Sequence, residues 1–354
     1  MLPIGISFYT FQGLSYIVDV YKKDAKVCRS FVDFATYVCL FPQLIAGPIV
    51  RYTTIEDELK NRTHSFDKFA YGVNRFVVGL AKKVILANNL GMLVDIMTKS
   101  NEKSVLSYWM VAIFFSLQIY YDFSGYSDMA IGIALLLGFH FNINFDSPYK
   151  SASITEFWRR WHISLSSWLR DYLYISLGGN RKGKIRQYMN LIITMFLGGL
   201  WHGASWNFVL WGMMHGVALA LHKGWMALVG RPKGERPHGI RRFLGMLVTF
   251  HFVCFCWIFF RHAEFSPAVD MLKQIAMAFR PQVFPQLIVG YWEVFALMGL
   301  GYVLHFLPDS WERGCTKTII RLPLVGKAVL LVALIYLVIQ MKSADVQPFI
   351  YFQF

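Results

Sequence analysis

The chain alternates long apolar runs with short polar segments, and this pattern is its dominant feature. Several runs approach the roughly 20 residues that an α-helix needs to cross a bilayer. The alternating strands typical of outer-membrane barrels are absent from the sequence. The pattern therefore predicts an all-α, polytopic transmembrane helical bundle. Its main apolar segments are residues 1–21, 66–96, 105–121, 126–141, 187–222, 243–260, 287–307 and 324–341.

One further apolar segment, residues 31–50, is interrupted by Pro42, Gly47 and Pro48. Proline removes a backbone donor and breaks or kinks a helix. Irregular backbone at membrane depth is tolerated only where protein buries it. We therefore expect a re-entrant or kinked segment here, followed by a polar loop or surface helix at 51–65.

Residues 142–186 mix aromatic rings with charged side chains. An interfacial amphipathic helix has this character, with its rings at headgroup level and its arginines reaching towards water. The rings recur at spacings of three, seven and four residues, at Trp158, Trp161, Trp168 and Tyr172.

Charge supports the membrane assignment and orients the chain. Only 16% of its 354 residues are charged, against about a quarter in soluble proteins. The net charge of +14 falls in short clusters between apolar runs, which favours lipid headgroups over nucleic acid as the partner. If 178–186 and 231–242 are both cytoplasmic, an even number of crossings separates them. The uncharged stretch 187–222 fits two crossings with a tight turn near Gly203–Asn207.

His202 lies in the middle of that uncharged stretch. One interpretation is a packed histidine that hydrogen-bonds a carbonyl between helices. The other is a general base, because burial disfavours the charged imidazole. The glycines and tryptophans around His202 favour the general base, since glycines leave room for a ligand or a backbone and indole rings enclose the site. These neighbours are Gly198, Gly199, Gly203, Trp201 and Trp206.

His162 follows Arg159 and Arg160, and two interpretations stand level. The segment is either a solvated interfacial helix or a basic mouth that holds a phosphate-bearing donor. For His215 and His222, packing or an interfacial position is the better interpretation. The histidines lack metal-ligand spacing, so no metal site is predicted.

Asp122 and Asp128 lie six positions apart around Gly125. Ionisable groups at membrane depth are functional candidates. A helix broken at Gly125 would form an ion site of the kind that secondary transporters use. A polar network between helices is the alternative.

Five longer motifs stand out along the chain: LPIGISFYTFQGLSYIVDVY (2–21), FPQLIAGPIVRY (41–52), QIYYDFSGYSDMAIGIALLLGFHFNINFDSPY (118–149), FWRRWHISLSSWLRDYLYISLGGNRKG (157–183) and MFLGGLWHGASWNFVLWGMMHG (195–216). Taken together, they resemble the membrane-bound O-acyltransferases, in particular the bacterial alginate O-acetylation branch, which is similar to the D-alanine transferases of teichoic acid. The resemblance runs over almost the whole chain and includes its ending, PFIYFQF.

The resemblance implies that His202 is the near-invariant catalytic histidine and His162 the second polar position of the family. It also implies a tunnel through the membrane in which a cytoplasmic acyl donor meets an acceptor from the far side. We expect donor binding by Trp158, Arg159, Arg160 and Trp161. We expect Trp201, Trp206, Asn207 and Asp122 to line the tunnel.

The implied activity is transfer of acetyl from a cytoplasmic thioester, acetyl-CoA or another, with no bound cofactor. Periplasmic acetyltransferase and polysaccharide-modification proteins would pass it to an exported polysaccharide, alginate, with cellulose, peptidoglycan or another envelope polymer as alternatives. The protein would be multi-pass in the bacterial inner membrane. Different-class alternatives are an ion-coupled transporter using Asp122 and Asp128, and a non-catalytic scaffold. Family members carry further segments before the motif that starts here at residue 2, so the single domain 1–354 is expected to lack them.

Overall fold

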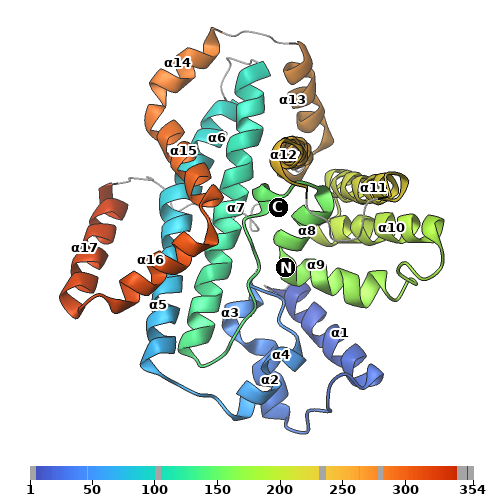
Figure 1. The fold of residues 1–354 in the computed structure, drawn as a ribbon, viewed down its shortest axis with the longest axis vertical. Helices are drawn as coiled ribbons and strands as arrows, with labels where there is room; N and C mark the ends of the chain where they lie inside the picture. The colour runs from blue at the N-terminus through green and yellow to red at the C-terminus, as the bar shows by residue number, and fades with distance from the viewer. Residues whose placement is uncertain are drawn as a thin grey trace. The chain divides into compact units, whose positions relative to one another are not determined.

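A computed structural model describes residues 5–45, 47–99, 105–230, 237–262, 264–277, 282–340 and 349 of the chain. Within these ranges every regular element is helical and no strand occurs, which confirms the all-α prediction (Figure 1). The helices are α1 (Ile6–Lys22), α2 (Phe31–Cys39), α3 (Phe41–Leu44), α4 (Tyr52–Lys60), α5 (Phe66–Ala81), η1 (Lys82–Ala87), α6 (Asn88–Lys99), α7 (Val105–Leu136), η2 (Pro148–Lys150), α8 (Ile154–Arg160), α9 (Ile163–Trp168), η3 (Leu169–Tyr174), α10 (Lys184–His202), α11 (Trp206–Leu228), α12 (Gly239–Arg261), α13 (Phe265–Met277), α14 (Val283–Gly290), α15 (Trp292–Phe306), α16 (Asp309–Arg321) and α17 (Leu324–Gln340).

Contacts within the chain define two compact units, and α7 contributes to both. The first unit consists of Met1–Met92, Leu117–Asn144 and Leu297–Gln353. The second consists mainly of Leu93–Ser116 and Phe145–Ala296. Each unit is described by itself below.

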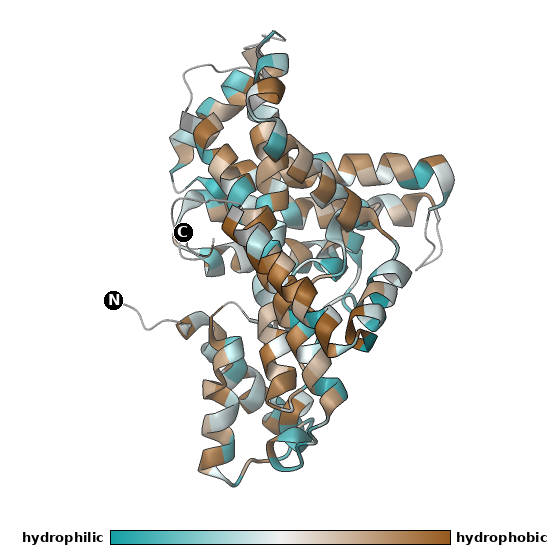
Figure 2. Cartoon of the chain, turned by 90° about the vertical axis from the view of Figure 1, so that its left-hand side faces the viewer, coloured by the Kyte–Doolittle hydropathy of each residue, from teal (hydrophilic) through white to brown (hydrophobic). Residues whose placement is uncertain are grey.

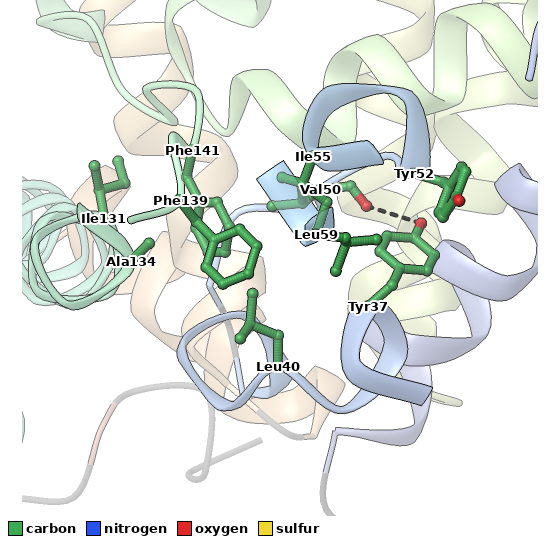
Figure 3. Packing of buried hydrophobic residues seen from close by; sticks show 10 residues of the cluster. All are labelled: Tyr37, Leu40, Val50, Tyr52, Ile55, Leu59, Ile131, Ala134, Phe139 and Phe141. Carbon is green, nitrogen blue, oxygen red and sulfur yellow. Dashed lines mark hydrogen bonds between the residues drawn. The ribbon is translucent and has the colours of Figure 1, made fainter. Parts of the chain in front are cut away.

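The first unit has a hydrophobic core around the kinked segment 31–50. Figure 3 shows the hydroxyl of Tyr37 donating a hydrogen bond to the carbonyl of Val50 over 3.1 Å. This bond fastens α2 to the chain that follows the Pro42–Pro48 break. The predicted kink is confirmed, while entry of this segment into a membrane stays a prediction. The buried members of the core are Tyr37, Leu40, Val50, Tyr52, Ile55, Leu59, Ile131, Ala134, Phe139 and Phe141.

Glycine pairs bring α5 and α7 into backbone contact within the first unit. A Cβ added to Gly79 would lie 2.5 Å from the carbonyl oxygen of Gly125, and one added to Gly72 would lie 2.8 Å from that of Gly132. Small residues permit this close approach of helices. The predicted break at Gly125 is wrong, because α7 continues through it and Gly125 serves as a helix contact.

The two aspartates of α7 are ion-paired across the same interface. Asp128 accepts from Arg75 at 2.8 Å and from Lys82 at 2.6 Å, and Asp122 lies 2.6 Å from the Lys83 ammonium. A carboxylate held by cations in this way balances charge between packed helices. The structure therefore supports the helix–helix network for Asp122 and Asp128.

Within the second unit, α10 and α11 form a tight antiparallel pair. Added Cβ atoms at Gly199 and Gly212 would each lie 2.3 Å from a backbone oxygen of the other helix, those of Phe208 and Met195 respectively. The chain turns between His202 and Trp206, as the uncharged stretch predicts. Of the glycines near His202, Gly199 therefore admits the backbone of α11, whereas Gly203 faces the ring of Phe208 and Gly198 the side chain of Leu169.

Two helical stretches in the described ranges have the length and hydropathy to cross a membrane, Phe66–Thr98 and Gly239–Arg261. Two bent pairs extend this to four if each is one span: α14 with α15, bent by 92°, and α16 with α17, bent by 119°. The chain bends within the crossing predicted at 287–307, and that this segment crosses a membrane stays a prediction. Brown, hydrophobic residues run along many of the helices in Figure 2. Several are exposed, including Val248 at 71% and Val325 at 74%, as surfaces facing lipid require.

Candidate active site

His202 is the last residue of α10, and aromatic rings surround its imidazole. The ring centroids of Trp201, Phe260 and Trp211 lie 4.8, 5.0 and 5.2 Å from that of His202, and Phe208 lies at 6.0 Å. Three of the four rings meet it edge-on or nearly so. We call these four rings the aromatic enclosure. The rings cover much of the imidazole, and the residue as a whole is half-buried.

The aromatic enclosure differs from the one that the sequence predicts. Trp201 contacts the imidazole as expected, whereas Trp206 is 78% exposed. Trp206 therefore does not enclose His202, and Trp211 occupies that role. Trp206 is the first residue of α11, where the helix has only begun to pack against α10.

His162 is the N-cap residue of α9 and lies two positions after the end of α8. Its backbone adopts the left-handed conformation, with φ of 42°, and its side chain is only 1% exposed. This conformation is costly for a residue with a Cβ and persists only where the surroundings fix it. The imidazole stacks on Phe145 at 6.3 Å, and its Nδ1 lies 3.4 Å from the hydroxyl of Ser164. The chain thus turns sharply at this point to bury a histidine.

The predicted interfacial helix is therefore wrong as a single helix. The chain forms two short helices, α8 and α9, and the rings of Trp158 and Trp161 are buried instead of lying at a surface. Ser153 caps the start of α8 by accepting from the Glu156 amide, and the Glu156 carboxylate accepts from the amide of Ala152, the residue before the cap.

The structure brings His162 and His202 into one electrostatic environment. Burial lowers the pKa of His162 well below its usual value near 6.5, and the nearby His202 lowers it further. A neutral imidazole accepts a proton, which is the property that a general base needs.

A continuous series of rings connects the two histidines. His162 stacks on Phe145, whose ring lies 5.1 Å from that of Trp161. Trp161 lies 5.0 Å from Trp257, and Trp257 stacks on Trp211 at 5.9 Å. Trp211 then meets His202. Trp257, like Phe260 of the aromatic enclosure, comes from α12.

The two arginines before His162 have different environments. Arg159 is exposed. Arg160 is half-buried, and its guanidinium donates to Asp146 at 2.9 Å and to Glu156 at 3.1 Å. Arg160 therefore fastens the 145–150 segment to α8, and Arg159 is the better placed of the two to meet a soluble anion.

Asn207 is fully buried and holds the end of α12. Its amide donates to the carbonyl oxygens of His262 at 2.5 Å and Glu264 at 2.7 Å. The side chain thus fixes the loop that follows Phe260. Its position as a tunnel-lining residue stays a prediction.

Asp122 belongs to the first unit, where it pairs with Lys83. Its predicted place along the tunnel stays untested. Among the described residues, no group of three metal-ligating side chains gathers into a possible metal site.

Sequence reasoning missed the rings that α11 and α12 supply. Trp211 lies nine positions after His202. Phe260 lies 58 positions after His202, in a segment whose only visible feature is that it is apolar. Trp211 carried a weak local signal as a third indole in the stretch, whereas Phe260 carried none.

Comparison with known proteins places this architecture in a family. The chain is 51% identical over 271 residues to a protein of Azotobacter vinelandii named "Probable alginate O-acetylase AlgI", covering 77% of this chain and 53% of that protein. It is 38% identical over 301 residues to a peptidoglycan O-acetyltransferase of Helicobacter pylori, covering 77% and 56% respectively. A teichoic acid D-alanyltransferase of Bacillus subtilis is 27% identical over 274 residues, covering 74% and 69%.

The chain spans about half the length of the alginate O-acetylases that it matches. Residues 20–261, which include both histidines and all four rings of the aromatic enclosure, match the membrane-bound O-acyltransferase family. The aromatic enclosure of His202 and the buried His162 thus lie within the shared region. On these grounds the chain belongs to the membrane-bound O-acyltransferase family.

Proposed function

We propose that the protein is an acyltransferase that moves acetyl from a cytoplasmic thioester, acetyl-CoA, towards a hydroxyl of an exported polysaccharide. The observation that carries this proposal is the pairing of His202, within its aromatic enclosure, with the buried His162 nearby. Two neutral imidazoles beside aromatic rings suit proton transfer to and from oxygen and sulfur.

In the proposed reaction His202 acts as general base. It takes the proton of the acceptor hydroxyl while the hydroxyl oxygen attacks the thioester carbonyl. The tetrahedral adduct collapses, the carbon–sulfur bond breaks, and the imidazolium returns its proton to the departing thiolate. The products are an acetyl ester and a free thiol, with no other reactant. The aromatic enclosure limits access of water, which would otherwise hydrolyse the thioester.

His162 orients one of the two substrates beside His202. The exposed Arg159 attracts the phosphates of the donor, because a guanidinium binds phosphate in a two-pronged, charge-assisted way. The buried rings of Trp158 and Trp161 support the donor-binding region from the interior of the protein. The acyl donor would approach from the cytoplasm through a tunnel and the acceptor from the opposite side.

Alginate is the acceptor polymer that we propose, since the alginate O-acetylases match at about 50% identity over three quarters of the chain. The peptidoglycan O-acetyltransferase of Helicobacter pylori supports peptidoglycan as the second candidate, at 38% identity. Periplasmic modification proteins would complete delivery. The protein would act within the bacterial inner membrane, crossing it several times.

The test measures transfer of radiolabelled acetyl from acetyl-CoA to polymer in membranes from cells that lack the endogenous protein. His202→Ala is expected to abolish transfer at unchanged protein level. His238→Ala is the matched control, because His238 is exposed at the start of α12 and its side chain caps nothing. Transfer to alginate and to peptidoglycan is measured in parallel. Wild-type rates from His202→Ala would refute the proposal.

A further inference from the structure

Two histidines of α11, His215 and His222, have no part in the proposed chemistry. Both bond to side chains of α8, the short helix that ends two residues before His162. His215 bonds Trp158 and His222 bonds Thr155. The first bond is deeply buried and the second is half-buried.

The His215 bond has a defined direction. The indole nitrogen of Trp158 lies 3.2 Å from Nδ1 of His215. An indole N–H is a donor only, so Nδ1 is the acceptor and the imidazole proton resides on Nε2. His215 is 0% exposed and Trp158 is 8% exposed, so water does not replace this bond. A buried polar bond of this kind specifies one arrangement of the helices that it joins.

The same pair supports the aromatic enclosure. The ring of His215 lies 4.9 Å from that of Trp211, and Trp158 meets Trp211 edge-on at 5.7 Å. Trp211 in turn contacts His202 at 5.2 Å. The bond therefore acts on both histidines of the site, on His162 through α8 and on His202 through Trp211.

A second hydrogen bond joins the same two helices, α8 and α11, at another position along them. The hydroxyl of Thr155 lies 2.8 Å from Nδ1 of His222. Thr155 and Trp158 lie three residues apart on α8, and His215 and His222 lie seven apart on α11, so each pair shares one face of its helix. Two bonds at different positions along the helices restrict rotation of α8 relative to α11, whereas a single bond does not restrict this rotation.

We propose that His215 is a positioning residue, and that its acceptor nitrogen, assisted by His222, holds α8 so that His162 faces His202. The inference rests on the proposed function for its activity readout. Small displacements of a catalytic group lower turnover more than substrate binding. The role predicts a loss in kcat, whereas simple packing predicts only a loss of folded protein.

The experiment compares kcat and KM for acetyl-CoA, per folded molecule, in membranes containing the full protein. His215→Leu removes the acceptor and Trp158→Phe removes the donor while keeping an aromatic ring. Each is expected to lower kcat about tenfold, and His215→Leu, which lies outside the donor-binding residues, is expected to change KM little. His215→Asn keeps an acceptor near the Nδ1 position and is expected to restore most of the loss. The double variant Trp158→Phe/His215→Leu is expected to be no worse than either single variant.

Three results would overturn the inference. The first is wild-type kcat in His215→Leu alongside an inactive His202→Ala. The second is a loss in His215→Asn equal to that in His215→Leu. The third is a set of losses that multiply in the double variant. If His215→Leu does not accumulate as folded protein, Trp158→Phe and the Asn variant decide the question.

Failure of the proposed function is recognised separately, because His202→Ala would then remain active. In that case the inference is tested by a measurement that does not depend on enzymatic activity. In protein with ¹⁵N-labelled histidine, the His215 resonance is expected to show Nδ1 unprotonated and Nε2 protonated, and to change in Trp158→Phe. A proton on Nδ1 would contradict the bond on which the inference depends.

Discussion

The imidazole of His202 meets the indole of Trp211 edge-on, with ring centroids 5.2 Å apart and an interplanar angle of 89°. Trp211 is 2% exposed and contacts rings from α8 and α12 as well. It is therefore the largest fixed wall of the aromatic enclosure on the α11 side.

Removing this wall should admit water to the thioester. We expect Trp211→Ala to lower acetyl transfer at least tenfold and to raise the share of donor lost as free acetate. Trp211→Phe should keep most of the transfer, since an aromatic ring remains. The measurement is the ratio of polymer-bound acetate to free acetate released from labelled acetyl-CoA. An unchanged ratio in Trp211→Ala would show that the wall does not exclude water.

The α10–α11 contact should tolerate no side chain at Gly199. A Cβ there would lie 2.3 Å from a backbone oxygen, so the helices must separate. We expect Gly199→Ala to lower the free energy of unfolding by about 1–3 kcal/mol. Gly224→Ala, also in α11, is the matched control, because an added Cβ there would come no closer than 3.8 Å to the Tyr188 hydroxyl and alanine favours helix. Thermal unfolding in detergent distinguishes the two. Equal stabilities would contradict the close contact.

Stability should depend on pH through His162. Its folded-state pKa lies well below the usual value near 6.5, so the unfolded chain binds the proton first as the pH falls. The stability contributed by a neutral His162 is complete above that value and decreases as the pH falls from about 6.5 towards the folded pKa. His162→Asn removes the titrating group and tolerates positive φ. We expect its stability to change less between pH 7 and pH 5 than that of the wild type. The comparison uses chemical unfolding at several pH values, and parallel curves would count against a buried neutral His162.

The carboxylate of Asp128 should be structural. It is 15% exposed and accepts from both Arg75 and Lys82, so Asp128→Asn leaves two cations facing an amide. We expect a loss of about 2–4 kcal/mol in unfolding free energy, with acetyl transfer per folded molecule retained. Asp270→Asn serves as control, because its pairing with Lys273 is exposed and contributes about 0–1 kcal/mol. Loss of transfer at full stability would instead support a functional carboxylate.

The all-helical fold and the turn between α10 and α11 could be predicted from the sequence, because both depend on local signals. The uncharged stretch divides at 203–205, where a tight turn was expected. The orientation of the indoles could not be predicted. Trp206 and Trp211 are five residues apart, about 140° around a helix, so only one of them can face His202. The sequence does not say which.

Contacts between distant residues account for the other differences. The partners of Asp128 lie up to 53 positions away, so the pattern around Gly125 did not distinguish an ion site from an ion-paired interface. Phe260 reaches the His202 imidazole from α12 with no local motif to mark it. The sharp turn that buries His162 was missed because a histidine with positive φ has no sequence signature.

The most direct test of the central claim is acetyl transfer by His202→Ala, at wild-type protein level and with an intact unfolding transition. The account predicts loss of polymer acetylation to background, while His238→Ala retains the wild-type rate. Acetylation by His202→Ala at the wild-type rate would show that the imidazole enclosed by Trp211, Phe260 and Trp201 is not the catalytic base.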